Sequence, residues 1–274
     1  MNGSKDLKTI IYFKGVYDTL DLFTDHLIEA FESMGYGTFV YHTVNEEVSK
    51  KMLLRLLDES QEFAVVTFNN LGYNLSFEQS EAAEDEEKKP EEHNIWNYFH
   101  IPYIDILMDH PFHYEKPLCN MPETAVILCT DRNHVKYIRR FFKNIHQTDF
   151  LPHAGVELGH KHKPLNDRNI DVLYAGALPI YTVAKMIPDL HSIPEVDGEH
   201  MMQSVLGELV QHPEQTTEQA IEAYVKSVRG DISDGRLQEI IVKMRFLDSY
   251  ATSFFREQAV RILVESGIHV TAYG

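Results

Sequence analysis

The stretch AVILCTDRNHVKYIRRFF, residues 125–142, joins an apolar strand-like run directly to an amphipathic helix pattern. Residues 125–129 are apolar, and from residue 132 onward apolar and basic residues recur with helical spacing. Strands that alternate with helices in this way are typical of a parallel sheet covered by helices. The stretch therefore predicts an α/β protein, and it places the polar residues between strand and helix at an edge of the sheet.

The residues on either side repeat this alternation. Strands are expected at 9–13, 37–41, 63–68, 103–108 and 149–151, and helices at 20–34, 48–57 and 95–99. Asp18 or Thr19 can cap the first of these helices, and Gly35 can end it. Residues 76–94 are highly charged and almost free of large apolar groups, so we expect a solvated loop there.

The second half of the chain predicts a separate domain. A strand is expected at 170–174, followed by helices from 201 to 267 that are interrupted near 212–213 and 230–235. The sequence AVRILVESGIHVTAY, 259–273, repeats the helix, glycine and strand order of LIEAFESMGYGTFVY, 27–41. We therefore expect a Rossmann-like first domain at 1–152, a linker at 153–169 and the start of a second such domain at 170–274. Two strands do not complete a sheet of the usual size, so we expect the second domain to be truncated.

The composition is that of a globular protein with an acidic surface. The 274 residues are 43% apolar and carry a formal net charge of −17, which disfavours a nucleic-acid partner. Two cysteines, Cys119 and Cys129, are too few for a disulfide framework and favour a reducing compartment. The N-terminal segment lacks an apolar signal region, and no apolar run reaches membrane-spanning length. We therefore expect a cytoplasmic chain without a membrane span.

Polar residues follow most of the expected strands of the first domain. Ligands of open parallel sheets bind at the carboxyl ends of the strands. We therefore take as candidate site residues those that follow the strands, namely Gly15, Asn69, Asn70, Asp109, His110, Asp131, Asn133, His134, His153 and Gly155. Some have a structural alternative, because Asp131 can cap a helix, Gly15 can form a turn, and His153 can bind a buried carbonyl.

The sequence also limits the chemistry. Dinucleotide, P-loop, hydrolase-elbow and paired-cysteine motifs are absent. Asp109, His110 and His113 could belong to a metal site, but such a site needs three or four ligands held together, and no fixed spacing supplies the rest. The absence of an Asp-x-Asp motif disfavours a sugar transferase that holds its nucleotide through a metal. We therefore expect no metal cofactor.

Five segments, in order, resemble the bacterial glycosyltransferases related to the spore-maturation CgeB proteins. These segments are IPYIDILMDHPFHY, CTDRNHVKYIRRFF, FLPHAG, IDVLYAGAL and FFREQAVRILVESGIHVTAYG. The resemblance spans roughly residues 8–274, and residues 76–94 and 195–235 match least. It implies a GT-B fold, with two Rossmann-like domains that face a cleft.

The resemblance also implies roles for the two domains. The first would bind the acceptor, which can be a glycan, a protein or a small molecule, and the second would bind a nucleotide-sugar donor. Gly176 would approach the donor phosphates. We expect Asp109 or His110 to lie nearest the acceptor, with His134 and His153 lining the cleft. Two alternatives stay open, namely a noncatalytic nucleotide- or sugar-binding module and a metal-dependent hydrolase.

Overall fold

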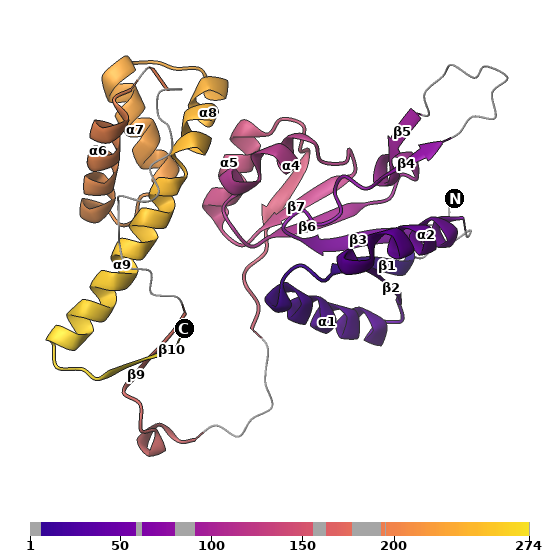
Figure 1. The fold of residues 1–274 in the computed structure, drawn as a ribbon, viewed down its shortest axis with the longest axis horizontal. Helices are drawn as coiled ribbons and strands as arrows, with labels where there is room; N and C mark the ends of the chain where they lie inside the picture. The colour runs from indigo at the N-terminus through magenta and orange to yellow at the C-terminus, as the bar shows by residue number, and fades with distance from the viewer. Residues whose placement is uncertain are drawn as a thin grey trace. The chain divides into compact units, whose positions relative to one another are not determined.

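The structure is a computed structural model that describes residues 7–58, 62–79, 91–155, 163–176, 193–194 and 196–273. The chain divides into two compact units, unit 1 at Met1–His153 and unit 2 at Ala154–Gly274, and each unit is described by itself (Figure 1). Of the expected linker at 153–169, residues 156–162 lie outside the described part of the chain.

Unit 1 is built on a six-stranded parallel sheet with the order β2-β1-β3-β6-β7-β8. The strands are β1 (Leu7–Lys14), β2 (Gly37–His42), β3 (Glu62–Phe68), β6 (Tyr103–Leu107), β7 (Ala125–Cys129) and β8 (Gln147–Phe150). The predicted α/β class with a parallel, Rossmann-like sheet is confirmed at this level. Strand β1 lies between β2 and β3. The chain therefore builds the sheet to one side of β1 with β2 and to the other side with β3 and the later strands.

Helices connect and cover these strands (Figure 1). They are α1 (Asp18–Ser33), α2 (Glu46–Leu57), α3 (Ile95–Tyr98), α4 (Glu115–Cys119) and α5 (Arg132–Phe141), with short 3-10 helices η1 (Thr43–Asn45) and η2 (Pro111–Tyr114). The apolar side of α1 packs on one face of the sheet through Phe23 and Leu27, which contact a buried cluster that includes Tyr12 and Phe68. The apolar residues that recur with helical spacing in α1 are thus the ones that pack on the sheet.

The start of α1 differs from the prediction. The helix begins at Asp18, its N-cap is Tyr17, and no side chain caps it. The preceding loop is instead ordered by Asp21, whose carboxylate accepts from the Gly15 backbone N–H at 3.0 and 3.1 Å. The predicted cap at Asp18 or Thr19 is therefore wrong. The predicted end is confirmed, because Gly35 follows the helix with φ of 91° and donates to Glu32.

The charged stretch 76–94 is not a plain loop. Strands β4 (Ser76–Gln79) and β5 (Glu91–Asn94) pair in an antiparallel hairpin, and residues 80–90 between them lie outside the described residues. Phe77 explains the difference, because its ring packs against Tyr98 at 5.0 Å and Phe99 at 6.0 Å. One aromatic anchor therefore orders a segment whose composition predicts a solvated loop.

Unit 2 contains a two-stranded parallel sheet and four described helices. The elements are η3 (Leu165–Asp167), β9 (Val172–Ala175), α6 (Gly198–Gln211), α7 (Thr217–Arg229), α8 (Asp234–Met244), α9 (Phe246–Glu265) and β10 (Val270–Tyr273). The predicted interruptions near 212–213 and 230–235 are confirmed. The break between α8 and α9 at Arg245 was not predicted, because neither Gly nor Pro marks it.

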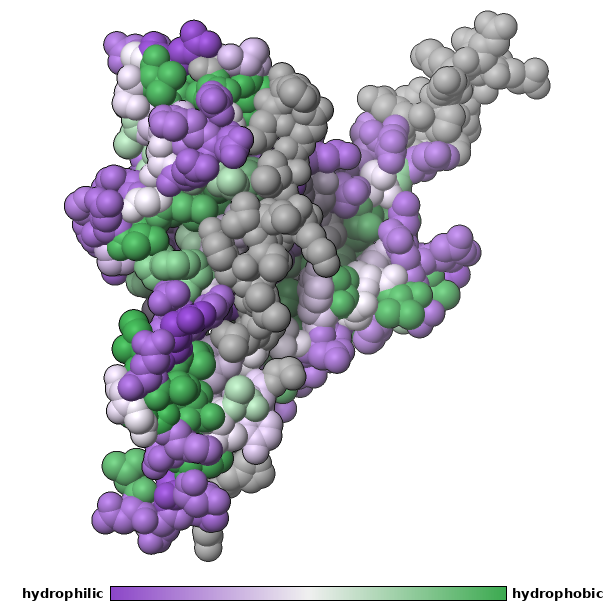
Figure 2. Space-filling model, turned by 60° about the vertical axis from the view of Figure 1, so that its left-hand side comes forward, coloured by the Kyte–Doolittle hydropathy of each residue, from purple (hydrophilic) through white to green (hydrophobic). Residues whose placement is uncertain are grey.

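The predicted repeat of helix, glycine and strand is also present. Strand β10 pairs in parallel with β9, as β2 pairs with β1 in unit 1, and Gly267 and Gly35 both have positive φ after the preceding helix. Apolar side chains lie at the surface of unit 2 (Figure 2). The second half of α9 contributes Ile262, which is 59% exposed, and Val264, which is 56% exposed. None of the helices in the described residues has both the length and the apolar composition that a membrane span requires.

Candidate functional site

The candidate residues of unit 1 follow strands that all run in the same direction. Gly15 follows β1, Asn69 follows β3, Asp109 follows β6, and Asp131 follows β7. His153 comes shortly after β8. Because parallel strands end at one edge of the sheet, these loops belong to the same edge. Strand order reverses between β1 and β3, which is where open α/β sheets form their ligand crevice.

Asp109 has the best-defined environment of these residues. Its exposed carboxylate accepts through Oδ2 from the Asn69 Nδ2 amide at 3.1 Å and from the Tyr114 hydroxyl at 2.8 Å. Burial raises the pKa of Tyr114 above its usual range, and the hydrogen bond to Asp109 and the charge of Asp109 raise it further. Tyr114 therefore remains a hydrogen-bond donor at neutral pH, and its hydrogen bond and that of Asn69 orient the Asp109 side chain.

Asn69 joins the ends of β3 and β6. Its Oδ1 accepts from the Met108 backbone N–H at 2.9 Å, and its own backbone N–H donates to Ile106 at 3.1 Å. Asn69 and Asn70 have positive φ values of 48° and 65°, a conformation that residues other than glycine adopt uncommonly. Asparagine is one of the residues that tolerate it best, which explains why two adjacent asparagines stand at this turn.

Side chains from other elements hold the loop after Asn70 in place. Trp96 Nε1 donates to the Gly72 carbonyl at 2.7 Å, and the Tyr103 hydroxyl donates to the Leu71 carbonyl at 2.8 Å. Asn94 Nδ2 donates to the next carbonyl in line, that of Tyr73, at 2.8 Å. Three consecutive carbonyls thus have partners outside the loop, which fixes the position from which Asn69 reaches Asp109.

Asp105 is a buried carboxyl group that the sequence analysis missed. It lies in the middle of β6 with 0% exposure, and its Oδ1 accepts from the Asn70 backbone N–H at 2.9 Å. Burial raises the pKa of Asp105 to about 7, against the opposing effect of the Asn70 hydrogen bond. A carboxylate within the otherwise apolar run YIDIL was the signal that could have identified it.

His110 serves the backbone and the local packing. Its Nδ1 accepts from the Phe112 backbone N–H at 3.2 Å, and its ring stacks on Phe112 at 3.7 Å between centroids. The neutral ring then carries its proton on Nε2, and that atom is buried. Since the Nδ1 lone pair is engaged and Nε2 is enclosed, Asp109 is better placed than His110 to take a proton from a ligand.

The residues after β7 form the start of α5. Asp131 is the N-cap, and its side chain accepts from the Asn133 backbone N–H at 2.6 Å, so the capping alternative is confirmed. Asn133 accepts from Lys136 at 3.2 Å, and the His134 ring lies 4.5 Å from that of His110. Asp131 and Asn133 thus bond within α5, and His134 contacts the His110 ring.

The cap leads to a prediction for the stability of unit 1. Replacing Asp131 by alanine is expected to lower the free energy of unfolding by about 1 kcal/mol, because the Asn133 N–H loses its partner. Asparagine at the same position caps equally well and should cost almost nothing. Urea unfolding followed by the fluorescence of Trp96, the single tryptophan, measures both. Equal losses in the two variants would contradict a capping role.

The remaining candidates have other surroundings. The Gly15 backbone N–H donates to Asp21, so the loop after β1 does not offer this amide to an anion, and Lys14 pairs with Asp25 at 2.6 Å. His153 and Gly155 are exposed, and Gly155 belongs to unit 2. Gly176, also in unit 2, donates its backbone N–H to Tyr273 at 2.8 Å. Of the predicted site residues, the hydrogen bonds within unit 1 thus bring Asn69 to Asp109, and a ring contact brings His134 to His110.

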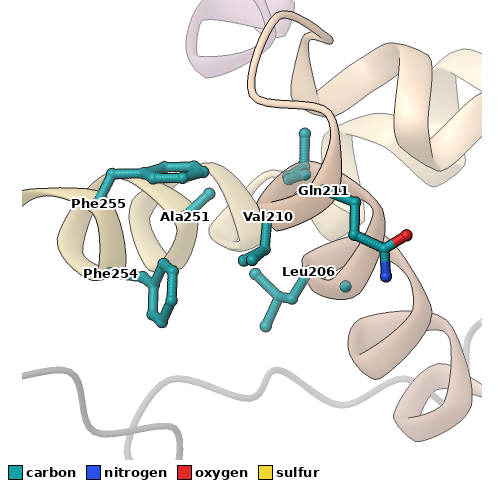
Figure 3. A pocket seen from close by; sticks show the side chains of 8 residues that line it. Leu206, Val210, Gln211, Ala251, Phe254 and Phe255 are labelled. Carbon is teal, nitrogen blue, oxygen red and sulfur yellow. The ribbon is translucent and has the colours of Figure 1, made fainter. Parts of the chain in front are cut away.

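Two further features of the described residues bear on ligand binding. No three His, Cys, Asp or Glu side chains of this part of the chain lie close enough to hold a metal ion together. In unit 2 a cavity of about 270 Å³ lies between α6 and α9 (Figure 3). It is lined by Leu206, Gly207, Leu209, Val210, Gln211, Ala251, Phe254 and Phe255. Gln211 is its one polar side chain, so this cavity offers no group for acid–base chemistry.

Comparison of the chain with protein-family models, with curated proteins and with solved structures found no match. Any assignment of function therefore depends on the residues themselves and on their geometry.

Proposed function

We propose that the chain is a glycosyltransferase, or the acceptor-binding part of one, which transfers a sugar from a nucleotide-sugar donor. The observation that carries the proposal is the Asp109 carboxylate, oriented by Asn69 and Tyr114 at the carboxyl edge of a parallel sheet. The ordered resemblance to glycosyltransferases supports the same reaction class. A GT-B arrangement of the two units and a donor site in unit 2 rest on that resemblance alone.

In the proposed reaction Asp109 acts as the general base. The acceptor hydroxyl oxygen forms a bond to the anomeric carbon of the sugar, and its proton passes to the Asp109 carboxylate. The bond from that carbon to the nucleoside diphosphate breaks, and the diphosphate leaves with the electron pair. A positioned base accelerates such a step by typically 10² to 10⁴-fold.

Asn69 and Tyr114 have a positioning role in this proposal. Both donate a hydrogen bond to Oδ2 of Asp109. The other carboxylate oxygen, Oδ1, is a second hydrogen-bond acceptor that these two residues do not use. Among the described residues, no hydrogen-bond donor is placed on Oδ1. An acceptor hydroxyl could therefore bind at Oδ1 without displacing either neighbour. Holding a base in one orientation lowers the entropic cost of reaching the reactive geometry.

The test is the release of nucleoside diphosphate from a panel of UDP-, GDP- and dTDP-sugars, with simple glycosides as acceptors. We expect one donor to be turned over, and Asp109→Asn to lower turnover by at least about a hundredfold because it removes the base. Asp149→Asn is the matched control, since it removes the same charge from an exposed position on β8 and should keep wild-type turnover.

Two outcomes would count against the proposal. Equal turnover in wild type and Asp109→Asn would remove Asp109 from the mechanism. Binding of a nucleotide sugar, seen as a thermal shift, without diphosphate release from any donor would favour the noncatalytic binding module instead.

A further inference from the structure

Helix α5 is basic in a protein that is strongly acidic overall. Between residues 125 and 155 there are five Lys and Arg residues and only two carboxylates, Asp131 and Asp149, whereas the whole chain has a formal charge of −17. Helix α5 itself contains no Asp or Glu. The helix therefore presents a local positive charge that the composition of the chain does not predict.

Four of these cations lie on one side of the helix, and we call them the cationic stripe: Arg132, Lys136, Arg139 and Lys143. Their spacing of four, three and four residues keeps them within one narrow face, although Lys143 lies just beyond the last helical residue. All four are exposed. At 1.5 Å per residue the stripe is about 16 Å long.

No carboxylate of the described residues pairs with the cationic stripe. Lys136 donates to the Asn133 side chain at 3.2 Å, Lys143 to the Arg139 carbonyl at 2.9 Å, and Arg139 to the Thr148 carbonyl at 2.9 Å. Arg132 lies over the Phe150 ring at 4.2 Å. These partners are all uncharged. The side chains are thus held in place while their charges remain available to a ligand.

Some cations elsewhere in the described residues do have acidic partners. Lys14 pairs with Asp25 at 2.6 Å in unit 1, and Lys226 pairs with Glu222 at 2.7 Å in unit 2. Like charges three or four residues apart destabilise a helix by a few tenths of a kcal/mol per pair. The stripe is therefore an unfavourable arrangement for the isolated chain, and a bound anion would relieve the repulsion.

We propose that the cationic stripe binds an anionic carbohydrate chain, one that carries carboxylate groups along its length. Charge complementarity supports an anionic ligand, and the linear arrangement of the four cations fits an extended one. The stripe begins at Arg132, directly after the N-cap Asp131 at the carboxyl edge of the sheet, the edge to which Asp109 belongs. The inference rests on the proposed function where it identifies this carbohydrate chain as the acceptor.

Two other polyanions fit the stripe less well. Single-stranded nucleic acids are usually bound by exposed aromatic rings next to the cations. In this segment Tyr137 and Phe142 are buried, and Phe141 and Phe150 are only partly exposed and already lie against Arg140 and Arg132. Anionic membranes favour a helix whose apolar face is free to insert, but Val135 and Ile138 on the apolar face of α5 are buried in unit 1. The exposed side chains of the cationic stripe are thus mainly charged, which suits a flexible chain that carries carboxylates along its length.

The test measures binding of the intact chain to fluorescein-labelled polygalacturonate by anisotropy, without any sugar donor. We expect binding at low salt that neutral dextran of the same length does not show. In Lys136→Glu/Lys143→Glu the affinity should fall at least about tenfold through lost charge contacts. The control Lys51→Glu/Arg55→Glu makes the same charge change on an exposed face of α2 and should bind as wild type does.

Each outcome decides the proposal. An equal loss of affinity in the α2 control would show that binding depends only on the net charge of the protein. Equal affinity for neutral dextran would show that binding does not depend on the charge of the ligand. Either result overturns the proposal. Tighter stripe-dependent binding of an RNA oligonucleotide, or of phosphatidylglycerol vesicles, would overturn the carbohydrate assignment. Should the glutamate variant fail to fold, Lys136→Gln/Lys143→Gln replaces it, with a smaller expected loss.

The binding assay and the transfer assay can fail separately. Stripe-dependent binding of polygalacturonate without diphosphate release would keep the carbohydrate site and reject the transferase. Diphosphate release with neutral acceptors and no polygalacturonate binding would keep the transferase and reject this inference.

Discussion

Replacing Gly72 by alanine is expected to lower the free energy of unfolding of unit 1 by about 3 kcal/mol or more. A Cβ at this position would lie 2.2 Å from Cζ and 2.3 Å from Cε1 of Phe13. Phe13 is buried between Tyr41 and Trp96, so its ring has little room to move. Gly72 also has φ of 78°, which adds about 1 kcal/mol or more for an L-residue.

Gly35→Ala separates these two causes. Gly35 has φ of 91°, but nothing lies within 4 Å of a Cβ built there. Its replacement should cost only the backbone contribution of about 1 kcal/mol. Urea unfolding followed by Trp96 fluorescence reports on unit 1 in both variants. Similar losses in Gly72→Ala and Gly35→Ala would show that the contact with Phe13 is not the cause.

The Gly72 variant also tests how the loop serves the candidate site. The Gly72 carbonyl accepts from Trp96, and the loop that contains it begins at Asn69, which holds Asp109. A shift of the loop away from Phe13 should therefore disturb the orientation of Asp109 as well as the stability. Under the proposed function, Gly72→Ala would lose turnover even at temperatures at which the chain stays folded.

Asp105→Asn is expected to stabilise unit 1 at alkaline pH and to leave its stability unchanged at acidic pH. The folded pKa of Asp105 is about 7, whereas an unfolded Asp titrates near 3.8. Between these values the unfolded chain is ionised at this position and the folded chain is protonated, so stability falls as the pH rises from about 4 to about 7. Above pH 7 the cost is constant, about 4 kcal/mol as an upper estimate.

Asparagine removes this titration and keeps the hydrogen bond. Its side-chain oxygen can still accept from the Asn70 backbone N–H, as Asp105 does at 2.9 Å. Urea unfolding of wild type and variant between pH 4 and pH 8 should give curves that coincide at low pH and separate as the pH rises. Asp149→Asn, at an exposed position, should follow wild type throughout. A variant less stable than wild type at pH 8 would contradict a destabilising buried charge.

The sequence by itself determined the alternation of strands and helices. Apolar periodicity located the six strands of the sheet and most of the helices, because each pattern reflects burial of one local face. It also determined which residues follow which strand, and with them the candidates Asn69, Asp109 and Asp131. The Asp131 cap was predictable for the same reason, since its hydrogen bond spans only two residues.

Only the tertiary structure decided how these residues meet. The contact of Asn69 with Asp109 spans 40 residues and depends on β3 and β6 being neighbours, which no local pattern encodes. The same holds for the raised pKa of Asp105, because burial on both faces of the sheet is a property of the packed fold. The β4–β5 hairpin is a further example, because Phe77 packs against Tyr98 and Phe99, about 20 residues later in the chain. Local propensity selects elements, whereas contacts between distant residues set their order, burial and charge.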